Sequence, residues 1–310
     1  MRVARILCTD IAGLRAQALG LAAAAGYEAD LRILRFLKPW SYVSPAFWPK
    51  PLLAVDPEAV AGPLPELIIG CGGAGARVAA ALRRPGVKVV AIQHPRMSLE
   101  KFDVVLAARH DGIAGKNVIV TRTALHGVTP AKLAAAADLW RPVFAPLRRP
   151  LVAVLLGGSN GRYEFGAASA WDLAAKLGTL MDQDGAGLVI TPSRRTSPEV
   201  VNILHEVLGK RGAWIWDGNG ENPYFGMLGL ADAIIATADS VSMVSEAVAT
   251  PMPVFVYRLP GKSSRIGAFM DALVTDGRVR DFAGRLALWD TVAFDDTALA
   301  AADMRKRLDA

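Results

Sequence analysis

The stretch ADAIIATADSVSMVSEAVATPMPVFVYRL, residues 231–259, is the part of the sequence that best predicts the fold. Its apolar run at residues 233–236 is typical of a parallel strand that is buried on both faces. A helix can follow over residues 241–249, because Ser240 is a good N-cap and two prolines come directly after the helix. Residues 254–257 then supply a second buried strand, so the pattern predicts a parallel α/β sheet.

Four polar residues follow the first of these strands, namely Asp239, Ser240, Ser242 and Glu246. Ligands of open α/β sheets bind beyond the carboxyl ends of the strands, and a helix N-terminus favours anions. The alternative is that Asp239 and Ser240 only cap the helix and that Glu246 is a solvated helix residue. Small and apolar neighbours surround Glu246, and a carboxylate in such a place is costly unless it has a role.

The bulk composition indicates a two-domain globular protein. The chain has 310 residues, of which 52% are hydrophobic and 21% charged, and no apolar run is long enough to span a membrane. Its two cysteines, Cys8 and Cys71, predict neither a disulfide framework nor a zinc site. We therefore expect a cytoplasmic protein, and we include peripheral attachment at the inner membrane in this expectation.

A formal charge of +6 suggests an anionic partner such as nucleotide phosphates or a lipid surface. The basic residues are spread along the chain and do not form an aromatic-interleaved patch, so we expect no nucleic-acid partner.

The first half contains six apolar runs that predict strands. They cover residues 3–7, 28–34, 67–69, 87–92, 104–105 and 117–120. Polar residues follow the runs, and Asp10, His110 and Asp111 are the candidates for a catalytic base at this edge. A structural role for the histidine is the alternative.

The segment RFLKPWSYVSPAFWPKP, residues 35–51, is rich in aromatic residues. One interpretation is a surface loop whose aromatic rings fold back onto the core. The other is an apolar lip that receives a lipid or another amphipathic acceptor.

A linker rich in proline and arginine, residues 141–150, separates the two halves. We expect a first domain over residues 1–145 and a second over residues 146–310. The amphipathic tail, residues 297–308, is a candidate for a helix that crosses back to the first domain. The facing strand ends of the two domains would define one cleft.

The second half opens with an apolar strand, residues 151–156, and a glycine-rich loop made of Gly157, Gly158, Ser159, Asn160 and Gly161. Backbone amides of such a loop can approach a phosphate closely, although an ordinary turn is the alternative. Ser193, Arg194 and Arg195 follow the next strand, at the same predicted edge, where arginine can bind oxyanions.

Several segments together resemble one family. They include LLGGSNGRY, VITPSRRTSPEVV, NPYFGMLGLADAIIATADSVSMVSEA and PVFVYRLPGKSSRIGAFMDAL. These are similar to the mitochondrial-fission ("elongated mitochondria") family of bacteria and plants, whose members are described as glycosyltransferase-like. A more distant resemblance links GGSNG and SVSMVSEA to the peptidoglycan GlcNAc transferase that makes lipid II.

The resemblance implies a GT-B-like fold, with two facing Rossmann-like domains, parallel sheets and an interdomain cleft. It implies no cofactor, with a nucleotide-diphosphate sugar as the substrate. It places Gly158, Ser159 and Asn160 near the diphosphate, Glu246 near ribose or sugar hydroxyls, and Ser193 and Arg194 near the phosphates. The chain departs from well-known transferases in one respect, because Ala238 stands eight residues before Glu246 where a second glutamate would be.

The leading functional hypothesis is an inverting, metal-independent glycosyltransferase with a lipid-linked or glycan acceptor. Asp10 or the His110/Asp111 pair would accept the proton of the acceptor hydroxyl. The alternative is a noncatalytic GT-B scaffold that binds a protein partner or a membrane surface. A sugar-nucleotide epimerase is a third hypothesis, but the sequence shows no acid–base pair for it.

Overall fold

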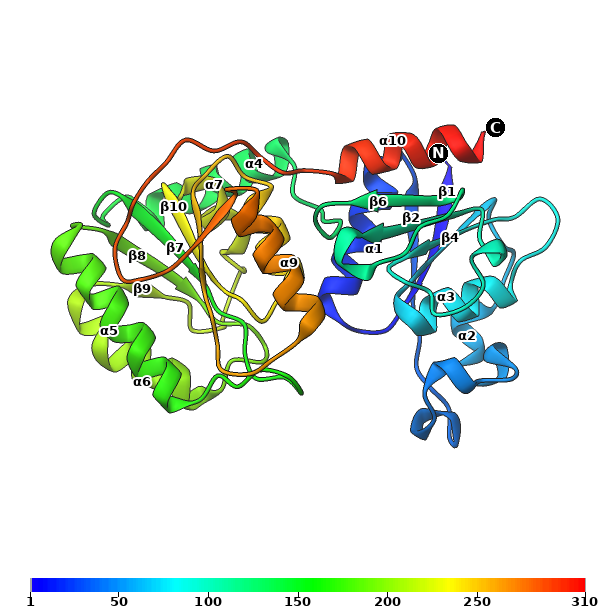
Figure 1. Ribbon diagram of the computed structural model, residues 1–310, viewed down its shortest axis with the longest axis horizontal. Coiled ribbons are helices and arrows are strands. Elements are labelled where there is room, and N and C mark those ends of the chain that lie inside the picture. The colour runs from blue at the N-terminus through cyan, green and yellow to red at the C-terminus, as the bar shows by residue number, and fades with distance from the viewer. Residues whose placement is uncertain (1, 310) are drawn as a thin grey trace. The chain divides into compact units, whose positions relative to one another are not determined.

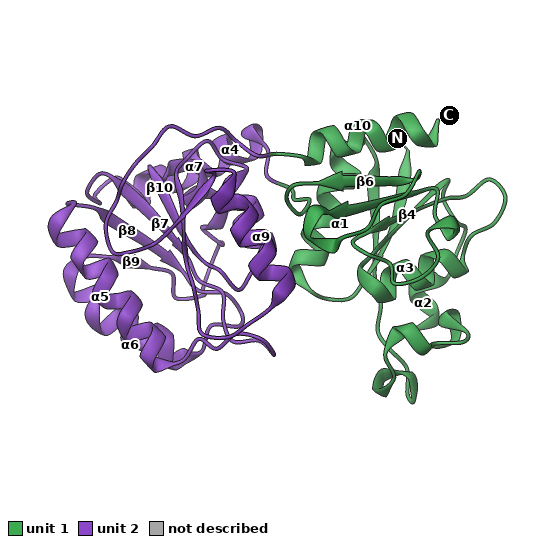
Figure 2. Cartoon of the chain, viewed as in Figure 1, with its two compact units in different colours: residues 1–127, 295–310 green, residues 128–294 purple. Residues whose placement is uncertain are grey.

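Short apolar runs form two parallel sheets of six strands each, as Figure 1 shows for the computed structural model, which describes residues 2–309. The chain divides into two compact units, which are coloured separately in Figure 2. Unit 1 comprises Met1–Gly127 and Asp295–Ala310, and unit 2 comprises Val128–Phe294. The predicted α/β class with two Rossmann-like sheets is confirmed.

Unit 1 carries its sheet in the order β2-β1-β3-β4-β5-β6, and all neighbouring strands are parallel. Its strands are β1 (Val3–Cys8), β2 (Glu28–Ile33), β3 (Leu67–Cys71), β4 (Lys88–Ile92), β5 (Val104–Ala108) and β6 (Val118–Thr121). Its α-helices are α1 (Ala12–Ala24), α2 (Pro57–Val60), α3 (Gly72–Ala81) and α10 (Thr297–Leu308).

Unit 2 carries its sheet in the order β12-β11-β10-β7-β8-β9, again entirely parallel. Its strands are β7 (Leu151–Leu155), β8 (Gly187–Thr191), β9 (Trp214–Ile215), β10 (Ala233–Thr237), β11 (Val254–Tyr257) and β12 (Val279–Asp281). Its α-helices are α4 (Pro130–Phe144), α5 (Ala167–Gln183), α6 (Pro198–Val207), α7 (Tyr224–Leu230), α8 (Val241–Val248) and α9 (Ser264–Thr275).

Both faces of each sheet are covered, which is why the strands read as continuous apolar runs. In unit 1, Ile6 and Ile69 belong to one apolar cluster, together with residues of α1 and α10. Their strand neighbours Leu7 and Ile68 belong to a second cluster, with α3 and Trp48. Alternate residues of one strand therefore serve two separate cores.

The division between the units differs from the predicted boundary at residue 145. The chain passes into unit 2 after Gly127, so the segment predicted as a linker contains the last turn of α4. Helix α4 belongs to unit 2 because it packs closely against α7. A Cβ on Gly226 would lie 2.4 Å from Cδ1 of Trp140, and a Cβ on Gly229 would lie 2.7 Å from the carbonyl oxygen of Leu133.

Helix α10 is part of unit 1. Its buried side chains include Ala301 and Met304, which pack in the unit 1 core. Just before the helix, Asp296 accepts from the Arg122 guanidinium, with Nη2 and Oδ1 2.5 Å apart. Thr297 Oγ1 accepts from the backbone N–H of His126 at 3.2 Å.

Two further elements differ from expectation. Tyr224–Leu230 form α7, a short helix that the sequence analysis does not predict, because α4 provides an apolar surface for it. Strand β12 was not predicted; it adds three residues to the edge of the sheet beside β11. Within residues 2–309, the structure contains no helix with the length and hydropathy needed to cross a membrane.

Candidate functional site

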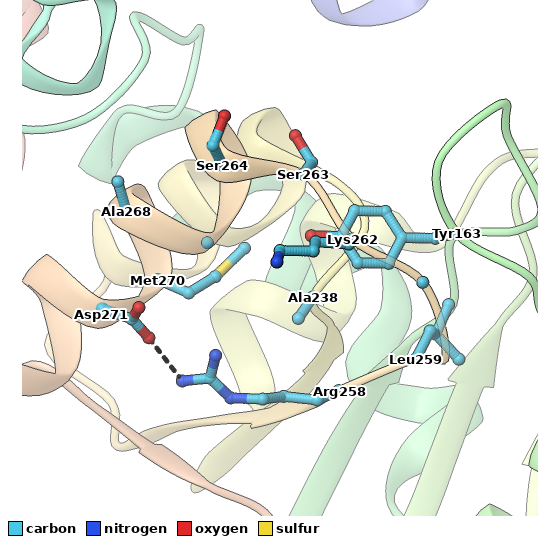
Figure 3. A pocket seen from close by; sticks show the side chains of 12 residues that line it. Tyr163, Ala238, Arg258, Leu259, Lys262, Ser263, Ser264, Ala268, Met270 and Asp271 are labelled. Atoms are coloured by element: carbon cyan, nitrogen blue, oxygen red, sulfur yellow. Dashed lines mark hydrogen bonds and ion pairs between the residues drawn. The ribbon is translucent and has the colours of Figure 1, made fainter.

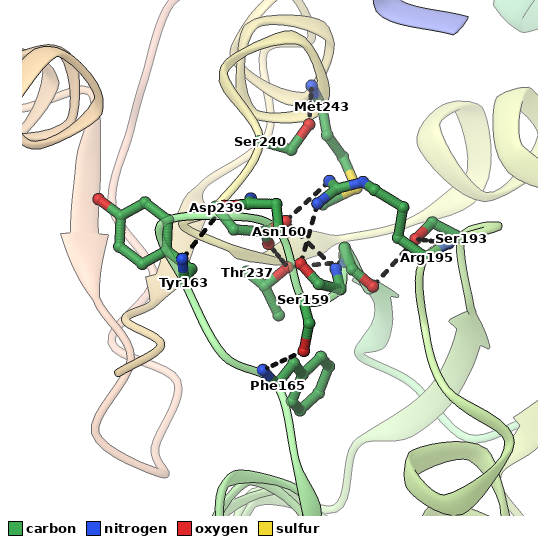
Figure 4. A network of polar contacts seen from close by, with 12 residues as sticks. Ser159, Asn160, Tyr163, Phe165, Ser193, Arg195, Thr237, Asp239, Ser240 and Met243 are labelled. Carbon is green, nitrogen blue, oxygen red and sulfur yellow. Dashed lines mark hydrogen bonds and ion pairs between the residues drawn. The ribbon is translucent and has the colours of Figure 1, made fainter. Parts of the chain in front are cut away.

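The two loops with most of the predicted site residues meet where the strand order of the unit 2 sheet reverses. The chain passes from β7 to β8 and β9 on one side, whereas β10 pairs with the other side of β7. Connections after two such strands leave the sheet in opposite directions, and the crevice between them is the usual ligand site. Residues 157–161 follow β7, and Asp239 and Ser240 follow β10 (Figure 4).

Asp239 joins the segments around this point. Its side chain is fully buried. Oδ2 accepts from the Gly158 backbone N–H at 3.2 Å and from Nη2 of Arg195 at 2.8 Å, and Oδ1 accepts from the Thr237 hydroxyl at 2.6 Å. A buried carboxylate needs such donors, because its desolvation is otherwise very costly. Asp239 therefore fastens three loops together, as Figure 4 shows.

The first two glycines of the loop are required by this packing. A Cβ on Gly157 would lie 2.1 Å from Oδ1 of Asp239, and a Cβ on Gly158 would lie 2.0 Å from the carbonyl oxygen of Arg195. The Gly157 N–H donates to Thr237 Oγ1 at 2.7 Å. The amides of both glycines are thus already bound to protein acceptors.

The rest of the loop is held by its own side chains. Ser159 Oγ accepts from the backbone N–H of Phe165 at 2.9 Å. Asn160 Oδ1 accepts from the backbone N–H groups of Arg162 and Tyr163, at 2.9 and 3.1 Å. In the described part of the chain, the N–H groups of Ser159 and Gly161 have no protein acceptor, so these two amides are available to a ligand.

The predicted residues after β8 have different surroundings. Ser193 Oγ donates to the carbonyl oxygen of Gly157 at 2.9 Å, so this hydroxyl also holds the loop. Arg195 donates from Nη1 to the Gly158 carbonyl oxygen at 2.9 Å, in addition to its pair with Asp239. Arg194 is exposed, and within residues 2–309 its side chain has no hydrogen-bond or ion-pair partner. Of the two arginines, Arg194 is therefore the one available to an anion.

Helix α8 begins as the sequence predicts. Ser240 is its N-cap, and the hydroxyl oxygen accepts from the backbone N–H of Met243 at 3.4 Å. Ser242 lies in the first turn and is half-buried. The helix contains eight residues, and its positive end points to the crevice edge where β10 ends.

Glu246 lies two turns into α8, against α7. Its Oε2 accepts from the Tyr224 hydroxyl at 2.6 Å. Burial raises the pKa of the Glu246 carboxyl, although the Tyr224 hydrogen bond and the Lys132 ammonium act in the opposite direction. Burial and the Glu246 charge also raise the pKa of Tyr224. Glu246 is therefore bound to the protein through one oxygen, and its Oε1 has no partner in residues 2–309.

A cavity of about 430 Å³ lies beside this crevice, at the ends of β10 and β11 (Figure 3). Its lining includes Tyr163, Ala238, Arg258, Lys262 and Ser263. Tyr163 connects the cavity to the glycine-rich loop, because it forms an isolated antiparallel bridge with Gly261. The cavity and the loop are thus parts of one surface in unit 2.

The cavity lining includes positive groups beside the acidic Asp271. Ser263 caps α9 and accepts from the Ile266 N–H at 3.4 Å, so the positive end of this 12-residue helix faces the cavity. Lys262 carries an ammonium without an ion-pair partner in the described residues. Arg258 pairs with Asp271 at 3.1 Å and with Asp281 at 2.7 Å, so its guanidinium is already engaged and the three side chains together carry a net negative charge.

The sequence analysis did not include Arg258 and Lys262 in the site, although both lie in the connection that follows β11. The signal for them was the same as for Arg194, namely basic residues at the carboxyl end of a predicted strand. In residues 2–309, no group of three His, Cys, Asp or Glu side chains is placed to hold a metal ion.

The predicted bases of unit 1 lie at the carboxyl edge of its sheet but not side by side. Asp10 follows β1 and is exposed, with Oδ1 2.5 Å from Nη1 of Arg15. His110 and Asp111 form a one-turn 3₁₀ helix after β5, and Asp111 Oδ2 accepts from the Ala108 N–H at 3.3 Å. Because β3 and β4 separate β1 from β5, the two positions are about 14 Å apart at strand level.

Gln93 is a polar residue of this edge that sequence reasoning did not select. It follows β4 and has a φ of 72°, which is unusual for a residue with a Cβ. Its Nε2 donates to Oε1 of the buried Gln17 at 3.4 Å. A strained backbone often marks a functional position, and no sequence pattern reveals a positive φ at glutamine.

Comparison with known proteins identifies relatives along almost the whole chain. The family model described as mitochondrial fission ELM1 matches residues 12–308. Mitochondrial fission protein ELM1 of Arabidopsis thaliana is 34% identical over 274 residues, covering 79% of this chain and 64% of that protein. This chain therefore spans less than two thirds of the plant protein. An uncharacterized protein of Rickettsia prowazekii (strain Madrid E) is 27% identical over 257 residues, covering 70% and 72% of the two chains. The predicted family resemblance is confirmed.

Solved structures share the fold at low sequence identity. UDP-GlcNAc 2-epimerase from Neisseria meningitidis, bound to UDP-GlcNAc, has a TM-score of 0.55 and 11% identity, with 99% of each chain covered. The Methanocaldococcus jannaschii enzyme, in complex with UDP-GlcNAc and UDP, has a TM-score of 0.53 and 12% identity over the full length of both chains. The glycosyltransferase SnogD from Streptomyces nogalater has a TM-score of 0.50 and 15% identity, covering 99% and 95%. The fold is therefore GT-B-like.

Proposed function

This chain belongs to the mitochondrial fission ELM1 family, and from that premise we propose that unit 2 binds a nucleotide-diphosphate sugar, which the protein uses as a glycosyl donor. The GT-B-like fold is shared with epimerases whose structures hold UDP-GlcNAc or UDP. That likeness concerns the fold, so the proposal for the ligand rests on the residues of the crevice.

The observation that carries the proposal is a set of unengaged positive groups around one crevice and its adjoining cavity. The set comprises the Lys262 ammonium, the Arg194 guanidinium, and the N-termini of α8 and α9. The amides of Ser159 and Gly161 add two neutral donors. A diphosphate is the ligand chemistry that such a site fits, because it brings several negative oxygens to donors that lie at two helix starts.

Glu246 is proposed to bind hydroxyl groups of the ribose or of the sugar. Its Oε2 is oriented by Tyr224, and Oε1 remains to accept a hydrogen bond. Burial strengthens hydrogen bonds to a carboxylate, because water competes less for it. Asp239 has another role in this proposal, since all of its described contacts hold the loops in place.

The proposed reaction is a direct displacement with inversion. The acceptor oxygen forms a bond to the anomeric carbon while the bond from that carbon to the diphosphate oxygen breaks, and the acceptor proton passes to a base of unit 1. Asp10 and the His110/Asp111 pair are the proposed bases. The diphosphate that leaves is stabilised by Lys262, Arg194 and the helix N-termini, which is why we propose that the reaction needs no metal ion. A lipid-linked or glycan hydroxyl compound is the proposed acceptor.

Calorimetry with the full chain tests the donor site. Nucleoside diphosphates and their sugars are titrated into the wild type and into Lys262→Ala and Glu246→Gln. Micromolar binding of one ligand, weakened about 10-fold or more in both variants, is expected. The matched control is Lys210→Ala, because Lys210 is exposed and precedes β9, at the opposite edge of the same sheet. Absence of binding across the panel, or equal loss in the control, would contradict the donor site.

A noncatalytic scaffold is the second candidate, and specific contacts favour it. The amides of Gly157 and Gly158 and the Arg195 guanidinium are satisfied within the protein, and Asp10 is paired with Arg15. The name of the plant relative refers to organelle fission and to no sugar transfer. Release of nucleoside diphosphate from a bound nucleotide sugar in the presence of a cell extract, abolished in Glu246→Gln, would reject the scaffold.

A further inference from the structure

The segment between β2 and α2 forms a projection on unit 1, which we call the aromatic projection and define as residues 35–53. Figure 1 shows it extending away from the unit 1 sheet, in blue at the bottom of the view. It consists of three one-turn 3₁₀ helices, Trp40–Tyr42, Pro45–Phe47 and Pro51–Leu53. Neither interpretation drawn from its sequence, a loop folded onto the core or an apolar lip, describes it completely.

One aromatic side chain folds inward and organises the projection. Trp48 is only 2% exposed and packs in the apolar cluster on the α3 side of the sheet. Its indole N–H donates to the carbonyl oxygens of Val43 and Trp40, at 3.1 and 3.3 Å. The Phe36 ring meets it edge-on, with the ring centres 4.8 Å apart. The projection is therefore built on an internal anchor.

Other apolar side chains of the same segment remain in solvent. Tyr42 is 77% exposed, Phe47 is 76% exposed and Leu53 is 63% exposed. Leu37 and Val43 are also exposed. These side chains contribute little to the core of unit 1, so a role in stability does not explain why large apolar residues stand at these exposed positions. Large apolar groups gathered on one exposed segment mark an interaction surface.

The charge of the segment indicates the partner. Residues 35–53 contain three basic residues, Arg35, Lys38 and Lys50, and no acidic residue. All three are exposed. Lysine is depleted in the cores of protein–protein interfaces, whereas aromatic rings beside lysine are typical of segments that sit at the surface of an anionic bilayer. The net charge of +6 for the whole chain attracts the same partner over a longer range.

The backbone of the projection is preorganised for such a contact. Four prolines, at positions 39, 45, 49 and 51, restrict its conformations. Turn hydrogen bonds join Phe47 N–H to the Ser44 oxygen at 2.9 Å and Leu53 N–H to the Lys50 oxygen at 3.0 Å. Little conformational entropy is therefore lost when the exposed side chains enter the bilayer interface.

We propose that the aromatic projection docks this chain on the surface of a bilayer that carries anionic lipid. Tyr42, Phe47 and Leu53 insert at the level of the headgroups, and Lys38 and Lys50 lie against lipid phosphates. The docking does not depend on the proposed transferase activity. If that activity holds, the location is suitable for a lipid-carried acceptor. Ile33 at the end of β2 pairs with Cys8 at the end of β1, so the projection leaves the sheet at the same edge as Asp10.

Vesicle co-sedimentation of the full chain tests this inference. The vesicles contain phosphatidylcholine alone or with about one third phosphatidylglycerol. Wild type is expected to sediment with the anionic vesicles and to be released by high salt, because the lysine contribution is screened. Tyr42→Ser combined with Phe47→Ser is expected to weaken the partition coefficient by about 10-fold or more, and Lys38→Glu combined with Lys50→Glu by a similar factor.

The matched control is Leu299→Ser, because Leu299 is 69% exposed on α10 and lies outside the projection. Its vesicle binding is expected to equal that of the wild type. Circular dichroism and nucleotide titration of each variant separate a loss of docking from a loss of folding or of the donor site. The inference is overturned if the wild type does not bind anionic vesicles, or if the Tyr42/Phe47 variant binds as well as the wild type. It is also overturned if those two substitutions instead abolish self-association in sedimentation velocity, which would make a second copy the occupant.

Discussion

Replacement of Asp239 by asparagine removes the charge that holds the crevice of unit 2 together. The carboxylate accepts from Gly158, Arg195 and Thr237, and its side chain is fully buried. Asparagine keeps the shape but offers one carbonyl oxygen and an NH₂ group. If the oxygen stays opposite Gly158, the NH₂ group faces Thr237 Oγ1, which already accepts from an amide.

The expected cost follows from these contacts. The Gly158 hydrogen bond loses its charged acceptor and the Thr237 hydroxyl loses its acceptor altogether, at a cost of about 1 kcal/mol each. The Arg195 side chain is 40% exposed, so the loss of its ion pair adds only about 0.5 kcal/mol after solvent screening. We therefore expect Asp239→Asn to destabilise unit 2 by roughly 2 to 3 kcal/mol. Asp239→Ala should cost about 4 kcal/mol, because the Gly158 N–H then has no acceptor.

Hydrogen exchange measured by mass spectrometry is the appropriate assay, because it resolves the two units. Peptides that cover residues 157–163 should exchange about 30-fold faster or more in Asp239→Asn, whereas peptides of unit 1 should not change. Asp182→Asn is the control, since Asp182 also pairs with an arginine of unit 2 but is 61% exposed. Equal exchange in residues 157–163 of the wild type and Asp239→Asn, or equal effects of the two substitutions, would refute this account of the loop.

Three further predictions concern stability. Arg278 is 2% exposed and donates to three backbone carbonyl oxygens around the end of α8. Arg278→Met should therefore lower the free energy of unfolding in urea by about 3 kcal/mol, and a loss under about 1 kcal/mol would contradict this role. Gly226→Ala should lower the free energy of unfolding by about 1 to 3 kcal/mol, because the new Cβ meets Trp140. Gly267→Ala should be neutral or stabilising, because its Cβ would meet nothing within 4 Å. A larger loss of stability in Gly267→Ala than in Gly226→Ala would refute the packing argument. Burial lowers the pKa of His126, although two nearby carboxylates act in the opposite direction. The neutral imidazole therefore contributes stability above the unfolded pKa of about 6.5, and this contribution is lost as the pH falls through the folded pKa. The urea midpoint of unit 1 should therefore decrease between pH 7.5 and pH 5, and His126→Gln should reduce this decrease; an unchanged slope in the variant would contradict it.

The strands were predictable because both sheets are parallel and covered on both faces. Residues 233–236 and 254–257 required nothing more than a continuous apolar run between polar or proline-rich segments, and they became β10 and β11. The family was predictable from several motifs together, and the family model confirms it over residues 12–308. Edge strand β12 has no continuous apolar run, because Val279 is buried and the two residues after it are exposed.

The sequence predicted neither helix α7 nor the boundary after Gly127, because both depend on packing between segments that are far apart in the chain. Tyr224–Leu230 contain two glycines, which usually disfavour a helix. In the fold these glycines allow α4 to approach closely, and burial against α4 outweighs their low helix propensity. A contact between segments about 90 residues apart cannot be read from either segment alone.

The sequence by itself determined which residues stand at the carboxyl ends of the strands, because strand length and polarity are local properties. It therefore predicted that the loop after β7 and the turn after β10 would carry polar groups at one edge. Only the tertiary structure decided how these groups are used. Asp239 binds the Gly158 amide and Arg195, and Thr237 binds the Gly157 amide, whereas Arg194 and Lys262 remain unengaged in residues 2–309. The reason is that hydrogen-bond partners depend on distances between strands that are adjacent in the sheet but about 80 residues apart in the chain.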